Sequence, residues 1–442
     1  MALLALVLAW SLSARDEWAR GAEGDGYYAW LFARSLVYDH DVDFKNDYSI
    51  CGDRWNVGVD RGTGHPNNNF SFGQIVFWVP ALEVARVVVR LPDDAPPDVV
   101  ASCKGPRVSF VLYLSPILGA LTVFLAYLVA RRFASDGAAA LAAGLVAVAG
   151  TNLAYAGFMV SYSHVYASFA IALLFWTSLR AEERPTLARF VAVGLALGLA
   201  ILQRPTEGVF VLVPLVIALR LQRRGELSIG GAVARLAIVA AGGLVGLVPL
   251  LVVYTYLYGG PFVVPQGRYF MFIGHGHPWL VLFAPRGGLF FSAPTAWLGV
   301  VGFVLALRDP KLRLLFGAML VAGAIELYVA SCALDWHESW GFGARRLTTL
   351  TPALVAAAAV FFERGRRWLR RRPARARTLL GLSWLVPACF STYAVVGATQ
   401  HNVIVPDYGH SQAAFWGEGS RWLWGVLDDQ IGDLAIYPAE LV

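Results

Sequence analysis

Charge is scarce in this sequence. Of its 442 residues, 15% are charged and 57% are apolar, and the mean hydropathy is +0.56. A soluble domain cannot bury that much apolar surface, so the composition predicts a protein that spans a membrane several times. The net charge of +6 would ordinarily suggest a nucleic-acid partner. We expect none, because the arginines cluster in short loops between apolar runs, as they do on the cytoplasmic side of membrane proteins.

Three other absences count against a transporter, a signal peptide and a metal site. No internal repeat is visible, and Glu326 is nearly the only acid deep in a span, which counts against a transporter. No basic segment precedes the apolar run 1–14, so we interpret that run as a shortened first span rather than a signal peptide. No His-Glu-x-x-His spacing occurs, so the evidence for a divalent metal is weak and the cofactor stays unknown.

The apolar runs predict an all-α polytopic membrane protein of about 11 transmembrane helices. A span needs about 20 residues, and in lipid its backbone must satisfy its own hydrogen bonds, which makes it a helix. Frequent Gly and Ala permit close helix approach. The runs lie near residues 1–14, 105–130, 138–158, 164–180, 188–203, 207–220, 229–256, 288–307, 311–332, 347–362 and 376–399.

The basic loops set the orientation. They include Arg131 and Arg132, the 180–189 and 220–224 loops, and the run 364–377, all of which we place in the cytoplasm. This puts the N-terminus inside and the C-terminus outside in a cytoplasmic (inner) membrane. We therefore divide the chain into a transmembrane module, 1–399, and an extracytoplasmic tail, 400–442.

Residues 15–104 form the long first outer loop of the transmembrane module. Within it, 70–90 is apolar enough to cross but contains Glu83, Arg86 and Arg90, so we expect an interfacial helix instead. Cys51 and Cys103 would both lie outside, where they could form a disulfide.

Candidate chemistry gathers on the outer side. The outer loop carries many acids, and Asp25 in Glu23-Gly24-Asp25-Gly26 is the first residue we consider catalytic. A histidine here could bind a phosphate, move a proton or bind a metal. Arginines that break the charge rule suggest an anionic partner such as a lipid phosphate, although helix-end snorkelling is the alternative. The substrate-binding candidates are Tyr28, His65, His164, Arg204, Arg345 and Arg346.

These elements together resemble the GT-C superfamily of membrane glycosyltransferases, which includes protein O-mannosyltransferases, lipid A aminoarabinose transferases, oligosaccharyltransferases and bacterial proteins of unassigned acceptor. Gly24-Asp25-Gly26-Tyr27-Tyr28 through Ala33-Arg34-Ser35-Leu36 is similar to the bacterial pattern G-D-E-x-x-Y-x-x-x-A-R-S-L. The likeness continues at Asp39 to Asp43, Gly150 to Asn152, Tyr162 to His164, Arg204-Pro205 and Gly341 to Leu347.

One position departs from the pattern. Many members carry a second acid directly after the aspartate, where this chain has Gly26. Glu23 could replace it by position, or the acid could come from elsewhere. The departure leaves open whether a divalent metal is bound and whether the protein is active.

The resemblance implies inverting transfer of a sugar from a polyprenyl-phosphate donor on the outer face. Asp25 would deprotonate an acceptor hydroxyl, and Arg204, Arg345 or His164 would stabilise the leaving phosphate. Membrane lipids and an unidentified glycan, lipid or protein acceptor are the expected partners. The alternatives are a lipid-glycan ligase with an Arg/His site, a transporter, and a non-catalytic homologue or scaffold.

Overall fold

The computed structural model describes residues 21–371 and 373, except 149, 158, 268, 285–287, 336–342 and 372. In these residues every regular element is a helix, and the one β pairing is the isolated bridge between Met271 and Ala333. The predicted all-helical membrane fold is therefore confirmed. The expected spans at 1–14 and 376–399 and the tail lie outside the described residues.

Two compact units divide the chain. Unit 1 comprises Met1–Leu121 and Tyr155–Phe270, and unit 2 comprises Thr122–Ala154 and Met271–Val442. Helices α8 (Leu114–Ala130) and α10 (Thr151–Gly157) carry the chain between the units.

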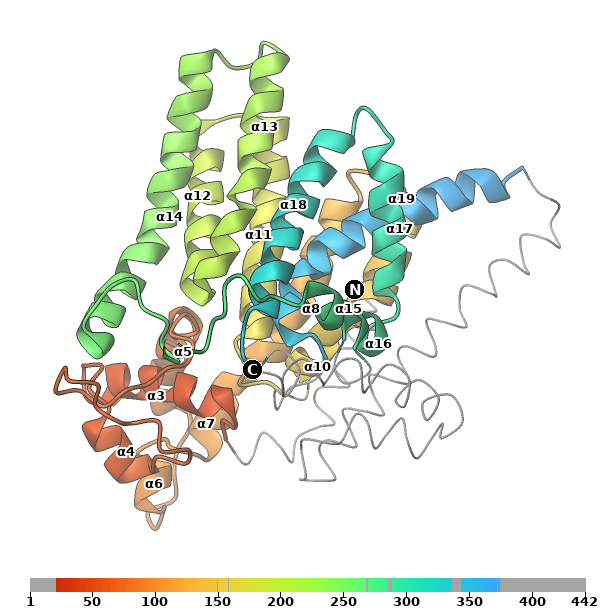
Figure 1. The fold of residues 1–442 in the computed structure, drawn as a ribbon. Helices are drawn as coiled ribbons and strands as arrows, with labels where there is room; N and C mark the ends of the chain where they lie inside the picture. The colour runs from red at the N-terminus through yellow and green to blue at the C-terminus, as the bar shows by residue number, and fades with distance from the viewer. Residues whose placement is uncertain are drawn as a thin grey trace. The chain divides into compact units, whose positions relative to one another are not determined.

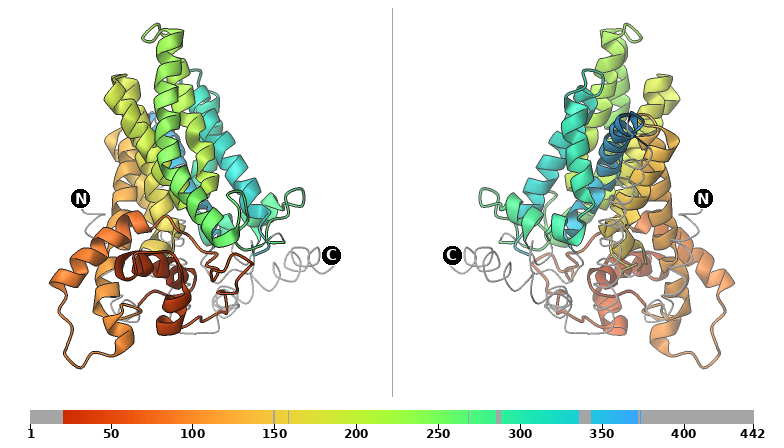
Figure 2. Two further views of the ribbon diagram at one scale, coloured as in Figure 1. Left: turned by 90° about the vertical axis from the view of Figure 1, so that its left-hand side faces the viewer. Right: turned by 90° about the vertical axis from the view of Figure 1, so that its right-hand side faces the viewer.

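The helices of unit 1 fall into two groups. A first group comes from the outer loop, and a second group is longer and apolar. The loop group is α3 (Asp25–Tyr38), α4 (Lys45–Cys51), α5 (Ile75–Val88) and α6 (Pro97–Val100), and α7 (Pro106–Leu112) begins the apolar stretch Pro106–Ala130 that α8 completes. The apolar group is α11 (His164–Glu183), α12 (Leu187–Gln203), η2 (Pro205–Val211), α13 (Leu212–Arg223) and α14 (Ile229–Tyr258). The loop group gathers at one end of α12 and α14 (Figures 1 and 2).

Unit 2 contains shorter helical pieces and two long helices. Its elements are α9 (Asp136–Ala142), η1 (Ala143–Val148), α15 (Pro278–Phe283), α16 (Leu289–Ser292), α17 (Ala296–Leu307), α18 (Arg313–Ser331), η3 (Arg345–Leu350) and α19 (Thr351–Leu369).

Local sequence signals explain the helix ends. The Ser228 hydroxyl accepts a hydrogen bond from the Gly231 amide at 3.0 Å and so caps the start of α14. Gly259 ends the same helix in the left-handed conformation, with φ of 77°. Pro205 has no amide proton and disfavours a helical residue before it, so α12 ends at Gln203.

Glycines set the crossing of α12 and α14. A Cβ on Gly198 would overlap the Gly242 carbonyl oxygen, and a Cβ on Gly246 would overlap Gly198. The two backbones therefore touch directly, which small residues permit and larger ones prevent. This confirms the close helix approach that the Gly and Ala content predicts.

The expected spans differ in how well they form single helices. Five of the described helices are long and apolar enough to cross a membrane, or six if one bent pair counts as a span. That pair, Asp136–Ala147 and Thr151–Gly157, replaces the expected span 138–158 and bends by 67°. The expected span 288–307 is also divided, because Pro294 cannot continue α16 and the chain turns before α17 begins.

Helix α5 occupies the segment expected to lie at the interface. It has 14 residues, fewer than the roughly 20 that a span needs. Its interfacial position stays a prediction.

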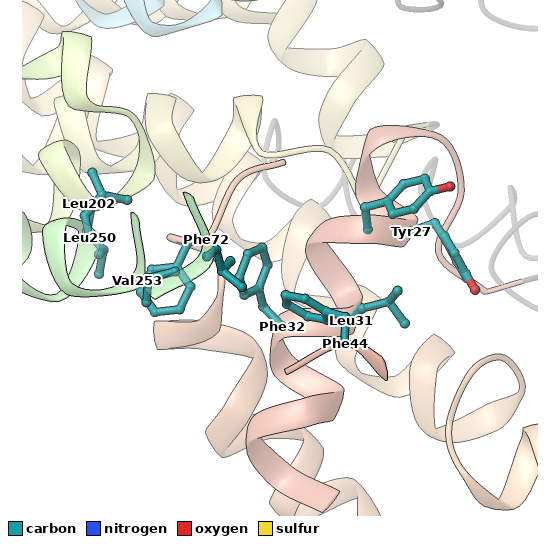
Figure 3. Close-up of a cluster of buried hydrophobic side chains, with 10 residues drawn as sticks. Tyr27, Leu31, Phe32, Phe44, Phe72, Leu202, Leu250 and Val253 are labelled. Atoms are coloured by element: carbon teal, nitrogen blue, oxygen red, sulfur yellow. The ribbon is translucent and has the colours of Figure 1, made fainter. Parts of the chain in front are cut away.

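An apolar cluster joins the outer loop to the helices of unit 1. Phe32 of α3, Phe44 and Phe72 are buried together with Leu202 of α12 and Leu250 of α14 (Figure 3). The Phe32 ring centroid lies 4.8 Å from Phe44 and 5.3 Å from Phe72, both edge to face. The loop is thus fixed on the helix ends by a packed core.

A disulfide joins Cys51 at the end of α4 to Cys103 just before α7, with the two Cα atoms 5.3 Å apart. The pairing that the sequence left open is therefore present in the structure. It closes a chain segment of 52 residues that includes α5 and α6.

Replacing both cysteines with serine should lower the free energy of unfolding by about 2–4 kcal/mol, because the open chain gains conformational freedom. Thermal unfolding of the purified variant would measure the loss. Cys332, which is buried and unpaired, provides the matched control as Cys332→Ala. An equal loss in the control would show that the cross-link itself contributes nothing.

Candidate active site

Asp25 is the first residue of α3 and is partly exposed. Gly24 precedes it with φ of 55°, a left-handed backbone conformation that glycine adopts most readily. A carboxylate in the first turn of a helix faces the positive end of the helix dipole. The glycine therefore turns the chain so that α3 begins at Asp25, the proposed catalytic aspartate.

The rest of the α3 motif anchors the helix. The Trp30 indole donates to the Ser102 carbonyl oxygen at 2.7 Å, and the Tyr27 hydroxyl lies 2.7 Å from the carbonyl oxygens of Cys51 and Gly52. Helix α3 is thus tied to the chain on both sides of the disulfide.

Arg34 is the buried centre of this anchor. Its guanidinium lies 2.5 Å from Asp47 and 2.6 Å from Asp39, and its Nε donates to the Ala101 carbonyl oxygen at 3.1 Å. Burial raises the pKa of the Asp47 carboxyl, although Arg34 opposes that rise. Arg34 and Asp39 of the recognised motif therefore hold the loop together rather than performing chemistry.

The Ser161 to His164 turn lies against the Asp25 segment. The Glu23 amide donates to Ser161 Oγ at 3.2 Å, and a side chain on Gly26 would overlap Ser161. His164 begins α11 and is 5% exposed, with its ring 4.6 Å from that of Tyr155. The structure therefore brings together the Asp25 and His164 segments.

A second contact chain leads to Arg204. Gln74 donates to the Ser161 carbonyl oxygen at 2.9 Å, and Gln203 donates to the neighbouring Gly73 carbonyl oxygen at 2.8 Å. Arg204 directly follows Gln203 and is partly buried. The two buried glutamines thus link the segment around Ser161, the segment around Gly73 and the segment that ends at Arg204.

His65 lies in a cluster with two other residues. Its Nδ1 is 3.1 Å from an Asp43 carboxylate oxygen, and its ring stacks on Tyr256 with centroids 4.0 Å apart. The backbone of the three asparagines after it is anchored by hydrogen bonds. Three side chains donate to their carbonyl oxygens, namely Tyr48 to Asn67, Tyr258 to Asn68 and Gln266 to Asn69.

Tyr28 is fully buried. Its hydroxyl donates to an Asp53 carboxylate oxygen at 2.9 Å and accepts from the Trp55 amide at 2.6 Å, and its ring stacks on Phe70. These contacts make Tyr28 part of the loop core, and direct contact with substrate stays a prediction.

Arg345 and Arg346 lie in unit 2 and share one carboxylate. Their guanidinium nitrogens lie 3.0 and 2.6 Å from the two oxygens of Asp335. Burial opposes ionisation of Asp335, but Arg346 and Arg345 more than offset it and hold the pKa of the carboxyl below its usual range. The three side chains together carry one net positive charge.

Lowering the pH should weaken this cluster. Because the folded-state pKa of Asp335 lies below its unfolded value near 3.8, its contribution to stability is full above that value and is lost as the pH falls through the folded pKa. Thermal unfolding between pH 6 and 2 should therefore show a smaller acid-induced loss for Asp335→Asn than for the wild type. Equal pH dependence in the two proteins would contradict the ion-pair assignment.

Metal ligands do not cluster in the part of the chain that the structure describes. No group of three or more His, Cys, Asp or Glu side chains there could hold a metal ion. Gly26, where the resembling proteins carry a second acid, has no room for a side chain beside Ser161.

Sequence reasoning identified the acid, the histidines and the arginines but missed their supports. Arg34, Gln74, Ser161 and Gln203 are all at most 4% exposed and bridge segments distant in the chain. A buried charge or amide needs a partner, but the sequence does not say which one.

Comparisons with known proteins agree with these observations. A family model described as dolichyl-phosphate-mannose-protein mannosyltransferase matches residues 105–254. A search of curated protein sequences finds no match.

Two solved structures of the Archaeoglobus fulgidus oligosaccharyltransferase are similar in fold. The apo form is 13% identical, with a TM-score of 0.55 over 90% of this chain and 55% of that one. The archaeal oligosaccharyltransferase AglB from Archaeoglobus fulgidus, in complex with an inhibitory peptide and a dolichol-phosphate, is 14% identical, with a TM-score of 0.50 over 89% of this chain and 55% of that one. The chain thus spans about half the length of these structures.

The chain shares the fold of these oligosaccharyltransferase structures. The family model over residues 105–254 agrees with the GT-C resemblance that the sequence motifs indicated.

Proposed function

We propose that this protein transfers a sugar from a polyprenyl-phosphate donor to an acceptor hydroxyl on the outer face of the cytoplasmic membrane. The observation that carries the proposal is the network in unit 1. Buried Ser161, Gln74 and Gln203 link the segments of Asp25, His164 and Arg204. A carboxylate can serve as the general base of such a transfer, and an imidazole or a guanidinium can stabilise the leaving phosphate.

Asp25 is the general base in this proposal. It takes the proton of the acceptor hydroxyl, whose oxygen forms a new bond to the anomeric carbon of the sugar. The bond between that carbon and the phosphate oxygen breaks, and the phosphate leaves with the electron pair. Attack from the side opposite the leaving group inverts the anomeric configuration.

Positive charge is available for the leaving phosphate. His164 and Arg204 are the candidates in unit 1, and Arg345 and Arg346 are those in unit 2. Both unit 2 arginines contact Asp335, and a guanidinium can bind phosphate oxygens through two parallel hydrogen bonds. His65, held by Asp43, would orient the sugar or the phosphate. Tyr28 would act by keeping the loop in shape.

The proposed site lies on the outer side of the membrane. A disulfide between Cys51 and Cys103 supports an oxidising location for the loop, because disulfides persist outside the cytoplasm. The AglB complex with dolichol-phosphate supports a lipid-phosphate donor. Membrane lipids would surround the apolar helices.

A donor panel tests the function. Membranes containing the protein would receive radiolabelled polyprenyl-phosphate sugars, with the corresponding nucleotide sugars as the comparison. We expect label to enter an acceptor fraction from at least one lipid donor and from no nucleotide sugar. Transfer directly from a nucleotide sugar would contradict the proposed donor class.

A further inference from the structure

Both neighbours of Asp25 are glycines, and both are in close contact with the same turn. A Cβ on Gly24 would overlap the Tyr162 hydroxyl and lie 2.9 Å from ring carbon Cζ. A Cβ on Gly26 would overlap the Ser161 side chain and lie 2.5 Å from the Ser161 carbonyl oxygen. Real Cβ atoms essentially never come this close to other atoms, so a side chain at Gly24 would force Tyr162 to shift, and one at Gly26 would also meet the Ser161 backbone.

Hydrogen bonds fix the same contact. Ser161 Oγ accepts from the Glu23 amide and lies within donating distance of the Glu23 carbonyl oxygen, both at 3.2 Å. The Ser161 carbonyl oxygen accepts from Gln74, which is 1% exposed. The backbone on either side of Asp25 is therefore held by Ser161 and Tyr162, and Asp25 itself is partly exposed.

We propose that Ser161 and Tyr162 are positioning residues that aim the Asp25 carboxylate at the acceptor hydroxyl. The inference rests on the proposed role of Asp25 as general base. A base must be within hydrogen-bond reach of its proton, and a misplacement of about 1 Å can lower a rate about 100-fold. The turn also fills the space that a second acid at position 26 would use, so an uncharged hydroxyl takes that place.

Ser161→Ala tests the hydrogen bonds without creating a clash, because it keeps the Cβ. We expect kcat to fall about 10- to 100-fold, with KM within about threefold of the wild type. Activity is measured in vesicles per folded molecule, with folded protein quantified by monodisperse elution. A residue that only stabilised the fold would lower the yield and leave kcat per folded molecule unchanged.

The contact between Gly24 and Tyr162 allows a rescue test. Gly24→Ala should lose activity by a similar factor, and Tyr162→Ala should recover part of that loss in the double variant, because removal of the ring makes room for the new methyl group. Gly225→Ala is the matched control. Gly225 also has a left-handed backbone, with φ of 73°, but nothing lies within 4 Å of its Cβ position. We expect it to keep wild-type kcat.

Asp25→Asn, measured in the same vesicles, distinguishes a failure of the positioning role from a failure of the proposed function. If Asp25→Asn is inactive while Ser161→Ala and Gly24→Ala keep wild-type kcat, the positioning role is overturned and the proposed function stands. If Asp25→Asn is fully active, both are overturned. Loss of kcat in Ser161→Ala, with partial rescue of Gly24→Ala by Tyr162→Ala, would support the positioning role.

Discussion

Asp25→Asn should reduce sugar transfer about 10²–10⁴-fold, the contribution expected of a well-placed general base. The substitution preserves the size of the side chain and one acceptor oxygen but removes the group that takes the proton. Asparagine is also well tolerated near a helix start, so α3 should still begin at the same place. The loss should appear in kcat, because the proposed role of this carboxylate is to take the proton of the acceptor hydroxyl in the chemical step.

Two other carboxylates on the same loop provide controls. Asp98 pairs with Lys104 on an exposed surface, so Asp98→Asn should retain wild-type transfer. Glu23 is exposed and stands two residues before Asp25, so Glu23→Gln tests whether it replaces the absent second acid. Initial rates at equal amounts of folded protein would show which of the two carboxylates acts as the base. Wild-type rates in Asp25→Asn together with a large loss in Glu23→Gln would transfer the role of base to Glu23.

Arg34→Ala should destabilise the outer loop by about 3–5 kcal/mol, the cost of breaking a buried ion pair by removing one partner. Asp47 is fully buried and would lose its contact with the guanidinium. Because burial already raises the pKa of Asp47, we expect this carboxyl to take up a proton in the variant, which would limit the loss. Denaturant unfolding, followed by fluorescence of the buried Trp30, would measure it.

An exposed arginine on the same loop is the matched control. Arg86 pairs with Glu83, and the two side chains are 39% and 51% exposed, so Arg86→Ala should cost less than about 1 kcal/mol. Arg34→Lys should fall between the two, because an ammonium retains the charge but cannot make the fork of contacts. If Arg34→Ala were no less stable than Arg86→Ala, the anchoring role of Arg34 would be wrong.

The fold class could be predicted because composition alone demands it. Long apolar runs must be helices in lipid, and the structure is all-helical in the residues it describes. The disulfide could be anticipated from topology, because placing Cys51 and Cys103 on one side leaves them free to pair. Breaks within spans were harder to predict. Pro294 divides an apolar run into α16 and α17, yet prolines inside α5 and α14 do not end those helices.

The candidate site could be predicted only as separate pieces. Asp25, His164 and Arg204 each stood out by residue type and place along the chain. Their connection depends on Gln74 and Gln203, two neutral residues whose importance comes from burial and long-range hydrogen bonds. Gly26 shows the same limit. The sequence shows only that an acid is absent at this position. The Ser161 backbone that leaves no room for a side chain there lies 135 positions further along the chain.

The most direct test of the account is the stoichiometry of one reaction. Purified protein in liposomes would receive the active polyprenyl-phosphate sugar, and both the glycosylated acceptor and the released lipid would be quantified. We expect one molecule of polyprenyl monophosphate for each sugar transferred, with both products lost in Asp25→Asn. Sugar transfer without release of polyprenyl monophosphate, or equal yields from Asp25→Asn, would contradict it.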